Sequence, residues 1–286
     1  MDDVVTVDSG RLRGISSSDG TVRSFLGIPY AAPPVGDLRW RPPQPVQGWS
    51  GIRDATGYGP ASRQPAIPGN SLYHGHETRF SEDCLYLNVW TGSVPGTAGR
   101  PVMVWLHPGA YQFGSGQNPL YDGSALARDG LTLVTINYRL GRFGFLSHPL
   151  LSEESGYGGS GNYGLMDIIE ALRWIQRNIE QFGGSPDNVT LFGVSAGGTA
   201  SITSAPARWQ RDCCTGPSRR AVPASGRCCT ATGTRSARPP WRQASRRVRR
   251  SPTCSGCGPW LSFADCRPRR SNRCCCPVRR GTGSSS

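Results

Sequence analysis

Short apolar runs separated by turn residues recur along the first 200 positions of the chain and predict strands. Near the N-terminus, three such runs cover 4–7, 10–14 and 22–28, and we expect them to form an antiparallel meander. The following stretch, 33–45, is rich in proline. It predicts a loop that packs through aromatic side chains rather than through regular structure.

Three later runs are almost continuously apolar and rich in β-branched residues, which favours buried strands over helices. They cover 85–90, 102–106 and 131–136. Beyond them the apolar residues recur with the spacing of a helix, and Gly183-Gly184 marks the end of that helix. One face of this predicted helix carries Leu165, Ile168, Ile169, Leu172, Ile175, Ile179 and Phe182.

A fourth apolar run, 189–192, leads directly into the pentapeptide Gly193-Val194-Ser195-Ala196-Gly197. A strand, a tight turn and a following helix are the context in which a nucleophile elbow occurs. The alternation of strands with a long amphipathic helix indicates an α/β fold. We expect a mostly parallel central sheet that is joined to the N-terminal antiparallel strands.

Composition divides the chain at about residue 205. Residues 1–205 hold 14 arginines and 17 acidic residues, whereas 206–286 hold 18 arginines and only two acidic residues. The net charge of +13 therefore comes from the C-terminal segment, which also holds ten of the 11 cysteines. We expect two regions: an α/β portion over 1–205, and a disordered tail over 206–286 that is rich in Arg, Cys, Pro and Ser.

The pentapeptide has the residues that an activated serine requires. A serine hydroxyl is a useful nucleophile only when a base takes its proton and donors receive the charge that forms on the attacked carbonyl oxygen. Gly193 and Gly197 permit a sharp turn and close packing around Ser195, and the Ala196 amide is a candidate oxyanion donor. By itself, the pentapeptide is also compatible with a glycine-rich turn that has no chemistry.

A segment about 90 residues upstream supports the chemical interpretation. It follows a predicted strand, has the sequence Trp-Leu-His-Pro-Gly-Ala-Tyr over 105–111, and is followed by Gly-Ser-Gly at 114–116. Small residues allow backbone amides to approach a substrate oxygen. Pro108 has no amide hydrogen, so Gly109 and Ala110 remain as the two candidate donors.

These motifs, together with others in the same order, resemble the type-B carboxylesterase and cholinesterase family over about residues 4–204. The resemblance implies an α/β-hydrolase fold, cut off after the nucleophile elbow, with Ser195 as nucleophile and Gly109, Ala110 and Ala196 as the oxyanion hole. It implies hydrolysis of small-molecule carboxylic esters, with neither a cofactor nor a metal ion. The other matching blocks are Phe-Leu-Gly-Ile-Pro-Tyr-Ala at 25–31, Leu-Arg-Trp-Arg-Pro-Pro at 38–43, Ser-Glu-Asp-Cys-Leu-Tyr-Leu-Asn-Val at 81–89, Asn-Tyr-Arg-Leu-Gly at 137–141 and Gly-Asn-Tyr-Gly-Leu at 161–165.

The chain departs from the family at the residue before the nucleophile and at one cysteine. Similar proteins usually carry Glu where Val194 stands, which leaves a weaker enzyme, or a non-catalytic binding protein of the same fold, as alternatives. Secreted members often pair the cysteine that matches Cys84 with a second one, but Ser62 stands at that second position. We therefore expect Cys84 to be a free, buried thiol in a reducing compartment.

The rest of the catalytic triad is missing from the expected place. The family supplies an acid and then a histidine, both well after the serine, but no histidine follows Ser195 and no triad acid is identified. We expect almost no activity from this chain, because oxyanion donors alone support little catalysis. The only histidines, none of which is expected to replace the base, are His74, His76, His107 and His148.

Three interpretations compete for the tail, 206–286. Its charge of +16 would attract phosphate, but its arginines show no helical spacing and its aromatic residues no stacking pattern, so a nucleic-acid partner is not expected. Cys254 and Cys257 have metal-ligand spacing, but most other cysteines are adjacent, and adjacent ligands rarely build a tetrahedral site. The third interpretation is translation out of frame.

The genetic code favours the third interpretation. Trp209-Gln210 must be encoded UGG-CA(A/G), and a frame that starts one base earlier forces Ala across this junction. The same shift forces Leu-Leu across Asp212-Cys213-Cys214. With ordinary codon choices, 209–222 in that frame permit Val-Ala-Ala-Gly-Leu-Leu-His-Arg-Ala-Val-Ala-Gln-Ser-Gly, which resembles the segment that follows the elbow in the family. We expect a base insertion or deletion near codons 204–208.

The sequence also bears on the compartment. Its N-terminal residues contain neither a basic nor an apolar leader region, and no apolar run approaches the roughly 20 residues that span a bilayer. A cytoplasmic chain without membrane contact is therefore the expectation. The pattern does not specify an oligomeric state.

Overall fold

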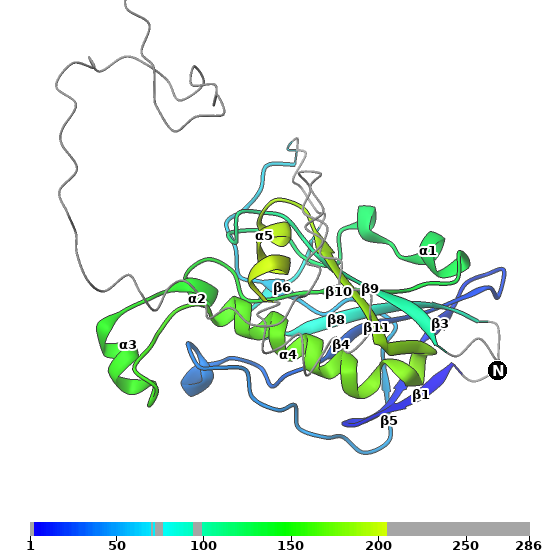
Figure 1. Ribbon diagram of the computed structural model, residues 1–286, viewed down its shortest axis with the longest axis horizontal. Coiled ribbons are helices and arrows are strands. Elements are labelled where there is room, and N and C mark those ends of the chain that lie inside the picture. Colours follow the sequence, from blue (N-terminus) through cyan, green and yellow to red (C-terminus); the bar gives the residue numbers. More distant parts are fainter. Residues whose placement is uncertain (1–2, 70, 72–76, 94–98, 205–286) are drawn as a thin grey trace, which may run out of the picture. The chain divides into compact units, whose positions relative to one another are not determined.

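The computed structural model describes residues 3–69, 71, 77–93 and 99–204 (Figure 1). The tail that the sequence delimits, 206–286, lies outside the described residues, and so do two of the four histidines, His74 and His76. No helix in the described ranges is long and apolar enough to cross a membrane.

The N-terminal meander forms two antiparallel hairpins that belong to different sheets. β1 (Val4–Val7) and β2 (Gly10–Arg13) are antiparallel, and β5 (Ile52–Asp54) pairs in parallel with β2 to complete a three-stranded sheet. β3 (Ile15–Ser16) and β4 (Val22–Pro29) form the second hairpin, which joins the central sheet. The antiparallel arrangement expected for this region is confirmed.

The central sheet has six strands in the order β11-β9-β10-β8-β4-β3. β9 pairs in parallel with both β10 and β11, whereas β8 runs antiparallel to β10 and to β4. Parallel strands are thus joined to antiparallel N-terminal strands, as predicted. The described sheet is not mostly parallel, however, because β8 pairs antiparallel with both of its neighbours and three of the five strand pairings are antiparallel. All four apolar runs form strands, with the bounds β8 (Tyr86–Gly92), β9 (Arg100–Leu106), β10 (Thr132–Ile136) and β11 (Gly184–Gly193).

The predicted long helix is α4 (Tyr163–Asn178), which lies across the central sheet (Figure 1). It continues into the 3₁₀ turn η3 (Ile179–Phe182) and ends at Gly183, whose φ of +78° is the left-handed conformation that glycine adopts readily. The fully buried positions of the helix are Tyr163, Gly164, Asp167, Ile168, Ala171, Trp174, Ile175 and Asn178.

The buried face of α4 differs in one respect from the predicted apolar face. Leu165, Ile169 and Leu172 are only partly buried, because the face is centred on Ala171 and Trp174 and includes polar residues. An apolar pattern by itself cannot place a helix to within a fraction of a turn when buried polar residues share the face.

The remaining elements are short. The proline-rich stretch 33–45 contains a single 3₁₀ turn and is otherwise loop, as predicted, with Trp40 Nε1 donating a hydrogen bond to the Arg142 carbonyl oxygen at 2.9 Å. The remaining short elements of the described residues are η1 (Gly36–Leu38), β6 (Ala61–Ser62), β7 (Phe80–Ser81), η2 (Pro119–Tyr121), α1 (Ser124–Arg128), α2 (Gly141–Phe145), α3 (Pro149–Glu154) and α5 (Ala196–Thr203).

Side chains of β9 alternate between two apolar clusters, one on each face of the sheet. Val102, Val104 and Leu106 are fully buried in the larger cluster, which also contains the buried apolar residues of α4. Met103 and Trp105 are partly buried in the smaller cluster with α1. Both faces of the sheet are therefore covered, which explains why the strand runs are almost continuously apolar.

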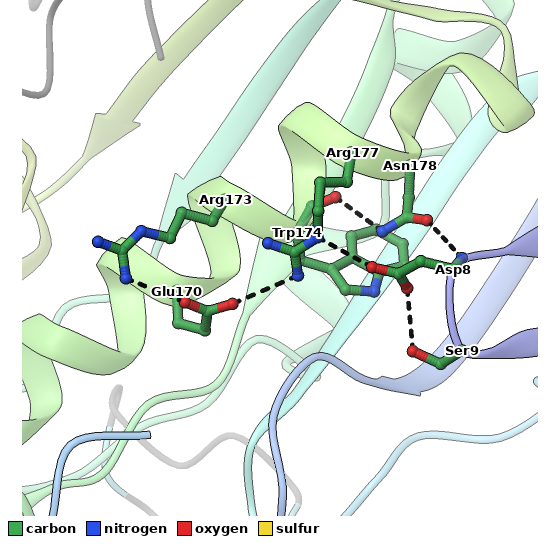
Figure 2. A network of polar contacts seen from close by, with 7 residues as sticks. All are labelled: Asp8, Ser9, Glu170, Arg173, Trp174, Arg177 and Asn178. Atoms are coloured by element: carbon green, nitrogen blue, oxygen red, sulfur yellow. Dashed lines mark hydrogen bonds and ion pairs between the residues drawn. The ribbon is translucent and has the colours of Figure 1, made fainter. Parts of the chain in front are cut away.

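A polar network fastens α4 to the turn between β1 and β2 (Figure 2). The Asp8 N–H donates to Asn178 Oδ1 at 2.8 Å, and Asn178 Nδ2 donates to the Trp174 carbonyl oxygen at 3.0 Å. The Arg177 guanidinium contacts the carboxylates of Asp8 and Glu170 at 2.9 Å and 3.3 Å. The three-stranded sheet is thereby fixed to the helix that precedes the strand leading to Ser195.

Candidate active site

The segment around Ser195 has the strand–turn–helix arrangement that the sequence predicts. β11 ends at Gly193, Ser195 has φ +54° and ψ −121°, and α5 begins at Ala196. A residue with a side chain rarely adopts this backbone conformation, and strain of this kind is concentrated at functional sites. Ser195 is exposed to solvent, as a nucleophile that must meet a substrate has to be.

Gly193 and Gly197 are required because the elbow approaches the end of β9 closely. In the parallel pair of β11 and β9, Gly193 lies opposite Leu106. A Cβ atom on Gly197 would be 2.0 Å from the Leu106 carbonyl oxygen, and one on Gly193 would be 2.7 Å from it. Both distances are far below the 3.5–4.0 Å of favourable non-bonded contact.

The segment that follows β9 forms a tight loop, 107–113, called the oxyanion loop below after its predicted role. Gly109, Ala110 and Tyr111 have φ values of +126°, +52° and +59°. The Gly109 carbonyl oxygen accepts hydrogen bonds from the N–H groups of Gln112 and Phe113 at 2.8 Å and 3.1 Å. Within the described residues, the N–H groups of Gly109 and Ala110 donate to no acceptor.

The fold therefore brings together two motifs that are about 90 residues apart in the sequence. Ser195 and Ala196 follow the end of β11, and Gly109 and Ala110 follow the end of the adjacent strand β9. Parallel neighbours end at the same edge of a sheet, which is the edge where α/β folds place their ligands.

The two described histidines have structural positions. Burial lowers the pKa of His107 to about 4, and its neutral ring stacks on Tyr138 with a centroid distance of 4.5 Å. His107 Nδ1 lies 2.8 Å from the Pro108 carbonyl oxygen. His148 is exposed and its Nδ1 accepts from the Leu150 N–H at the start of α3. Among the described residues, no group of three His, Cys, Asp or Glu side chains is arranged to hold a metal ion.

Cys84 is a free, fully buried thiol, as the sequence predicts. Burial raises its pKa to about 12, and a hydrogen bond with the Ser62 side chain acts in the opposite direction. Ser62 also accepts a hydrogen bond from the Leu140 N–H at 3.1 Å. The serine that replaces the expected second cysteine thus lies against Cys84.

A buried ion pair next to the site is absent from the sequence-based prediction. Asp167 on α4 accepts hydrogen bonds from the Arg139 N–H, Nε and Nη2 at 3.0, 2.8 and 2.7 Å, and both side chains are almost inaccessible. Burial by itself would lower the pKa of Arg139, but the Asp167 carboxylate outweighs it and the pKa is raised. Two residues on, the Gly141 N–H donates to the Tyr111 carbonyl oxygen at 2.7 Å, so this segment also contacts the oxyanion loop.

A strained serine between a parallel strand and a helix, beside a glycine-containing loop at the end of the adjacent strand, defines an α/β-hydrolase. Comparison with known proteins is more specific. The model of the carboxylesterase family matches residues 1–270, and the chain belongs to this family. The portion that it covers is the N-terminal part of the family's fold.

Three curated relatives each match two thirds of the chain or more. A fumonisin B1 esterase of Sphingopyxis macrogoltabida is 52% identical over 193 residues, which are 67% of this chain and 34% of that protein. A para-nitrobenzyl esterase of Bacillus subtilis (strain 168) is 47% identical over 207 residues, 71% of this chain and 41% of that protein. A mouse (Mus musculus) cholinesterase is 44% identical over 211 residues. The chain therefore spans well under half the length of these relatives.

Solved structures give the same relationship. A para-nitrobenzyl (PNB) esterase has a TM-score of 0.64 and 45% identity, over 70% of this chain and 40% of that one. A carboxylesterase of Geobacillus stearothermophilus has a TM-score of 0.61 and 45% identity, over 69% of this chain and 39% of that one. The fold expected from the sequence is thereby confirmed.

Proposed function

We propose that this chain carries the nucleophile and the oxyanion hole of a carboxylic ester hydrolase, without the base that would activate the nucleophile. The observation that carries the proposal is the strained Ser195, which lies beyond the end of β11, while the oxyanion loop begins at the paired end of β9. The N–H groups of Gly109 and Ala110, with no acceptor among the described residues, and of Ala196, at the first position of α5, are the oxyanion donors.

The reaction that this arrangement supports is two-step acyl transfer. Ser195 Oγ attacks the carbonyl carbon of a small-molecule ester, and the negative charge on the carbonyl oxygen is received by the three N–H groups. Collapse of this intermediate expels the alcohol and leaves an acyl-serine. Water then attacks the acyl group and releases the acid. Each step requires a proton to be taken from the attacking oxygen and given to the leaving group.

We propose further that the 286-residue polypeptide performs this reaction very slowly. No histidine follows Ser195 in the sequence, His107 is buried against Tyr138, and His148 caps α3. Oxyanion donors without a base retain only a small part of a serine hydrolase's rate.

Residues from about 206 onwards are, in our proposal, encoded out of frame. Support comes from the change in charge and cysteine content at this point, and from the forced Ala and Leu-Leu codons in the shifted frame. The pairwise matches to the relatives cover 67–71% of the chain, which is consistent with a family sequence that ends near α5.

A non-catalytic binding protein is the second candidate function. The observation that favours it is Val194, whose side chain is 48% exposed at the elbow where similar proteins usually carry a glutamate. An exposed apolar residue beside the nucleophile supplies surface for a ligand but no charge for catalysis.

A reducing compartment, and thus the cytoplasm, is also part of the proposal. It is supported by Cys84, which is free and buried against Ser62, because a thiol in this state needs no oxidising environment.

Labelling with a fluorophosphonate tests the nucleophile. We expect slow, stoichiometric modification of Ser195 in the wild-type chain, located by peptide mass spectrometry, and none at this position in Ser195→Ala. We expect this chain to hydrolyse a para-nitrophenyl ester at a rate lower by a factor on the order of 10⁶ than the rate of the related para-nitrobenzyl esterase, because the base is missing.

Two results would contradict these proposals. Serine-dependent turnover at the rate of the complete relative would show that a base is present after all. Complete absence of labelling at Ser195 after prolonged exposure would remove the nucleophile proposal and favour the binding protein.

A further inference from the structure

The turn that follows the oxyanion loop, 114–116, is held by side chains from distant segments, and is called the anchor turn below. The Gly114 N–H donates to Gln64 Oε1 at 2.7 Å, and Gln64 Nε2 donates to the Gly114 carbonyl oxygen at 3.0 Å. One amide side chain thus satisfies both backbone groups of a single residue. Gln64 comes from the loop after β6, 50 residues earlier in the chain.

The other two residues of the anchor turn are fixed as well. Ser115 Oγ donates to Glu77 Oε1 at 2.6 Å. The Gly116 N–H donates to Asn137 Oδ1, and Thr135 Oγ1 donates to the Gly116 carbonyl oxygen, both at 2.7 Å. The anchor turn is therefore bonded to the end of β10 and to two residues of the connection between β6 and β7.

Close packing around the anchor turn requires glycine at position 114. Its φ is +102°, and a Cβ atom there would lie 2.6 Å from His107 Nδ1 and 2.8 Å from the Pro108 carbonyl oxygen. The anchor turn thus packs against the first residues of the oxyanion loop. A displacement of Gly114 would be transmitted to the residues that precede Gly109.

The oxyanion loop itself is strained. Ala110 and Tyr111 are two consecutive residues with side chains and positive φ, and they follow Gly109, whose φ is also positive. Such a backbone persists only where the surrounding structure over-determines it. The Tyr111 carbonyl oxygen is held by the Gly141 N–H, and three residues further along the chain Gly114 is held by its two bonds to Gln64.

We propose that Gln64 is a positioning residue for the oxyanion hole. By fixing both backbone groups of Gly114, it keeps the strained loop in the conformation that leaves the N–H groups of Gly109 and Ala110 without acceptors among the described residues. Gln64 Nε2 also donates to the Ser62 carbonyl oxygen at 3.1 Å. The inference rests on the proposed function of this loop, and Gln64 acts through Gly114 without contacting the substrate.

Hydrogen exchange of backbone amides tests the proposal in the full chain. Gln64→Leu removes both bonds to Gly114 while keeping an apolar stem of similar length. We expect the hydrogen-bonded amides of this segment, those of Gln112, Phe113, Gly114 and Gly116, to exchange at least about tenfold faster than in the wild type, since each lost hydrogen bond corresponds to roughly a factor of ten. Exchange in β9 and β10 should be unchanged. Gln47→Leu, a substitution of an exposed glutamine just after the proline-rich stretch, is the matched control.

Gln64→Glu supplies a second variant with a readout that mere loss of packing would not produce. A protonated carboxyl group has one donor and one acceptor and can replace the amide, whereas the ionised group has no donor and repels the Gly114 carbonyl oxygen. Compared with the wild type at the same pH, loop protection in this variant should therefore be similar near pH 3, roughly one unit below the usual pKa of a glutamate, and at least about tenfold lower at pH 7. Glu77 and His107 are titratable groups that contact the anchor turn, and both are also present in the wild type. Exchange of the wild type at the same two pH values therefore shows how much of the pH dependence comes from them.

The proposal is overturned if Gln64→Leu leaves the exchange of 109–116 unchanged, or loosens β9 and β10 to the same extent. It is also overturned if protection in Gln64→Glu does not depend on pH, which decides the matter should Gln64→Leu not fold. The proposed function can fail separately. If Ser195 is not labelled, but substitution of Gln64 still loosens the loop, only the nucleophile proposal is contradicted.

Discussion

Single residues carry most of the recognisable chemistry of this chain. The sequence indicates Ser195, Gly193 and Gly197 because a nucleophile elbow needs them at fixed spacing, and the structure shows the close contact with Leu106 that requires both glycines. The sequence does not indicate Gln64 or Asp167. An isolated glutamine in a loop, or an aspartate on an apolar helix face, has no local signature, and its importance follows from partners 50 and 28 residues away.

Substitution of Gly197 tests the packing of the elbow at this scale. In Gly197→Ala, the new Cβ atom would lie 2.0 Å from a backbone oxygen of β9, so strand or helix must shift. We expect the free energy of unfolding to fall by about 1–3 kcal/mol, measured by urea denaturation.

Gly198→Ala is the matched control in the same helix. Its nearest contact would be 3.2 Å from the Gly193 carbonyl oxygen, which requires a shift of only a few tenths of an ångström, and alanine favours the helix by roughly 1 kcal/mol. Equal losses of stability in the two variants would show that close approach to β9 is not the reason for glycine at 197.

At the scale of elements, the molecule depends on α4. Its length and its end at Gly183 were predictable from apolar period and glycine. Which residues of the helix are buried was not fully predictable, because Asp167 and Asn178 are buried and are stabilised by partners on other elements. Asp167 ties α4 to the segment after β10. Asn178 ties it to the β1–β2 turn (Figure 2).

Breaking the buried ion pair measures one of these ties. In Asp167→Asn, the Arg139 guanidinium remains buried without a counter-charge, which typically costs about 3–5 kcal/mol. We expect a correspondingly lower midpoint in urea denaturation, with the far-UV circular dichroism of the folded protein unchanged.

The exposed pair of Arg13 and Asp54 is the comparison. Both of these side chains are more than half exposed, so Asp54→Asn should change stability little. A loss in Asp54→Asn as large as that in Asp167→Asn would contradict the assignment of the cost to burial.

At the scale of the whole molecule, charge and cysteine content change at about residue 205. The pairwise matches to the relatives cover 67–71% of the chain, whereas the family match over residues 1–270 extends into the arginine- and cysteine-rich tail. Buried sheet, elbow and oxyanion loop all lie before this boundary.

Sequencing of the gene across codons 204–208 tests the out-of-frame proposal. We expect one base too many or too few relative to a frame that continues with Val-Ala-Ala-Gly-Leu-Leu-His after the elbow. Restoring the frame should lower the arginine and cysteine content beyond this point. A verified gene whose uninterrupted frame encodes the tail as written, and whose shifted frame soon meets stop codons, would reject the frame shift.

Local sequence determined the strands, the long helix, the elbow and the small residues of the oxyanion loop, since each depends on period, glycine spacing or a missing amide hydrogen within a few neighbouring positions. Only the tertiary structure decided how β11 and β9 bring Ser195 beside Gly109 and Ala110, and which distant side chains support them. Gln64 on Gly114 and Asp167 on Arg139 are contacts between segments far apart in the chain. Their partners are set by sheet order and helix facing, which no local pattern encodes.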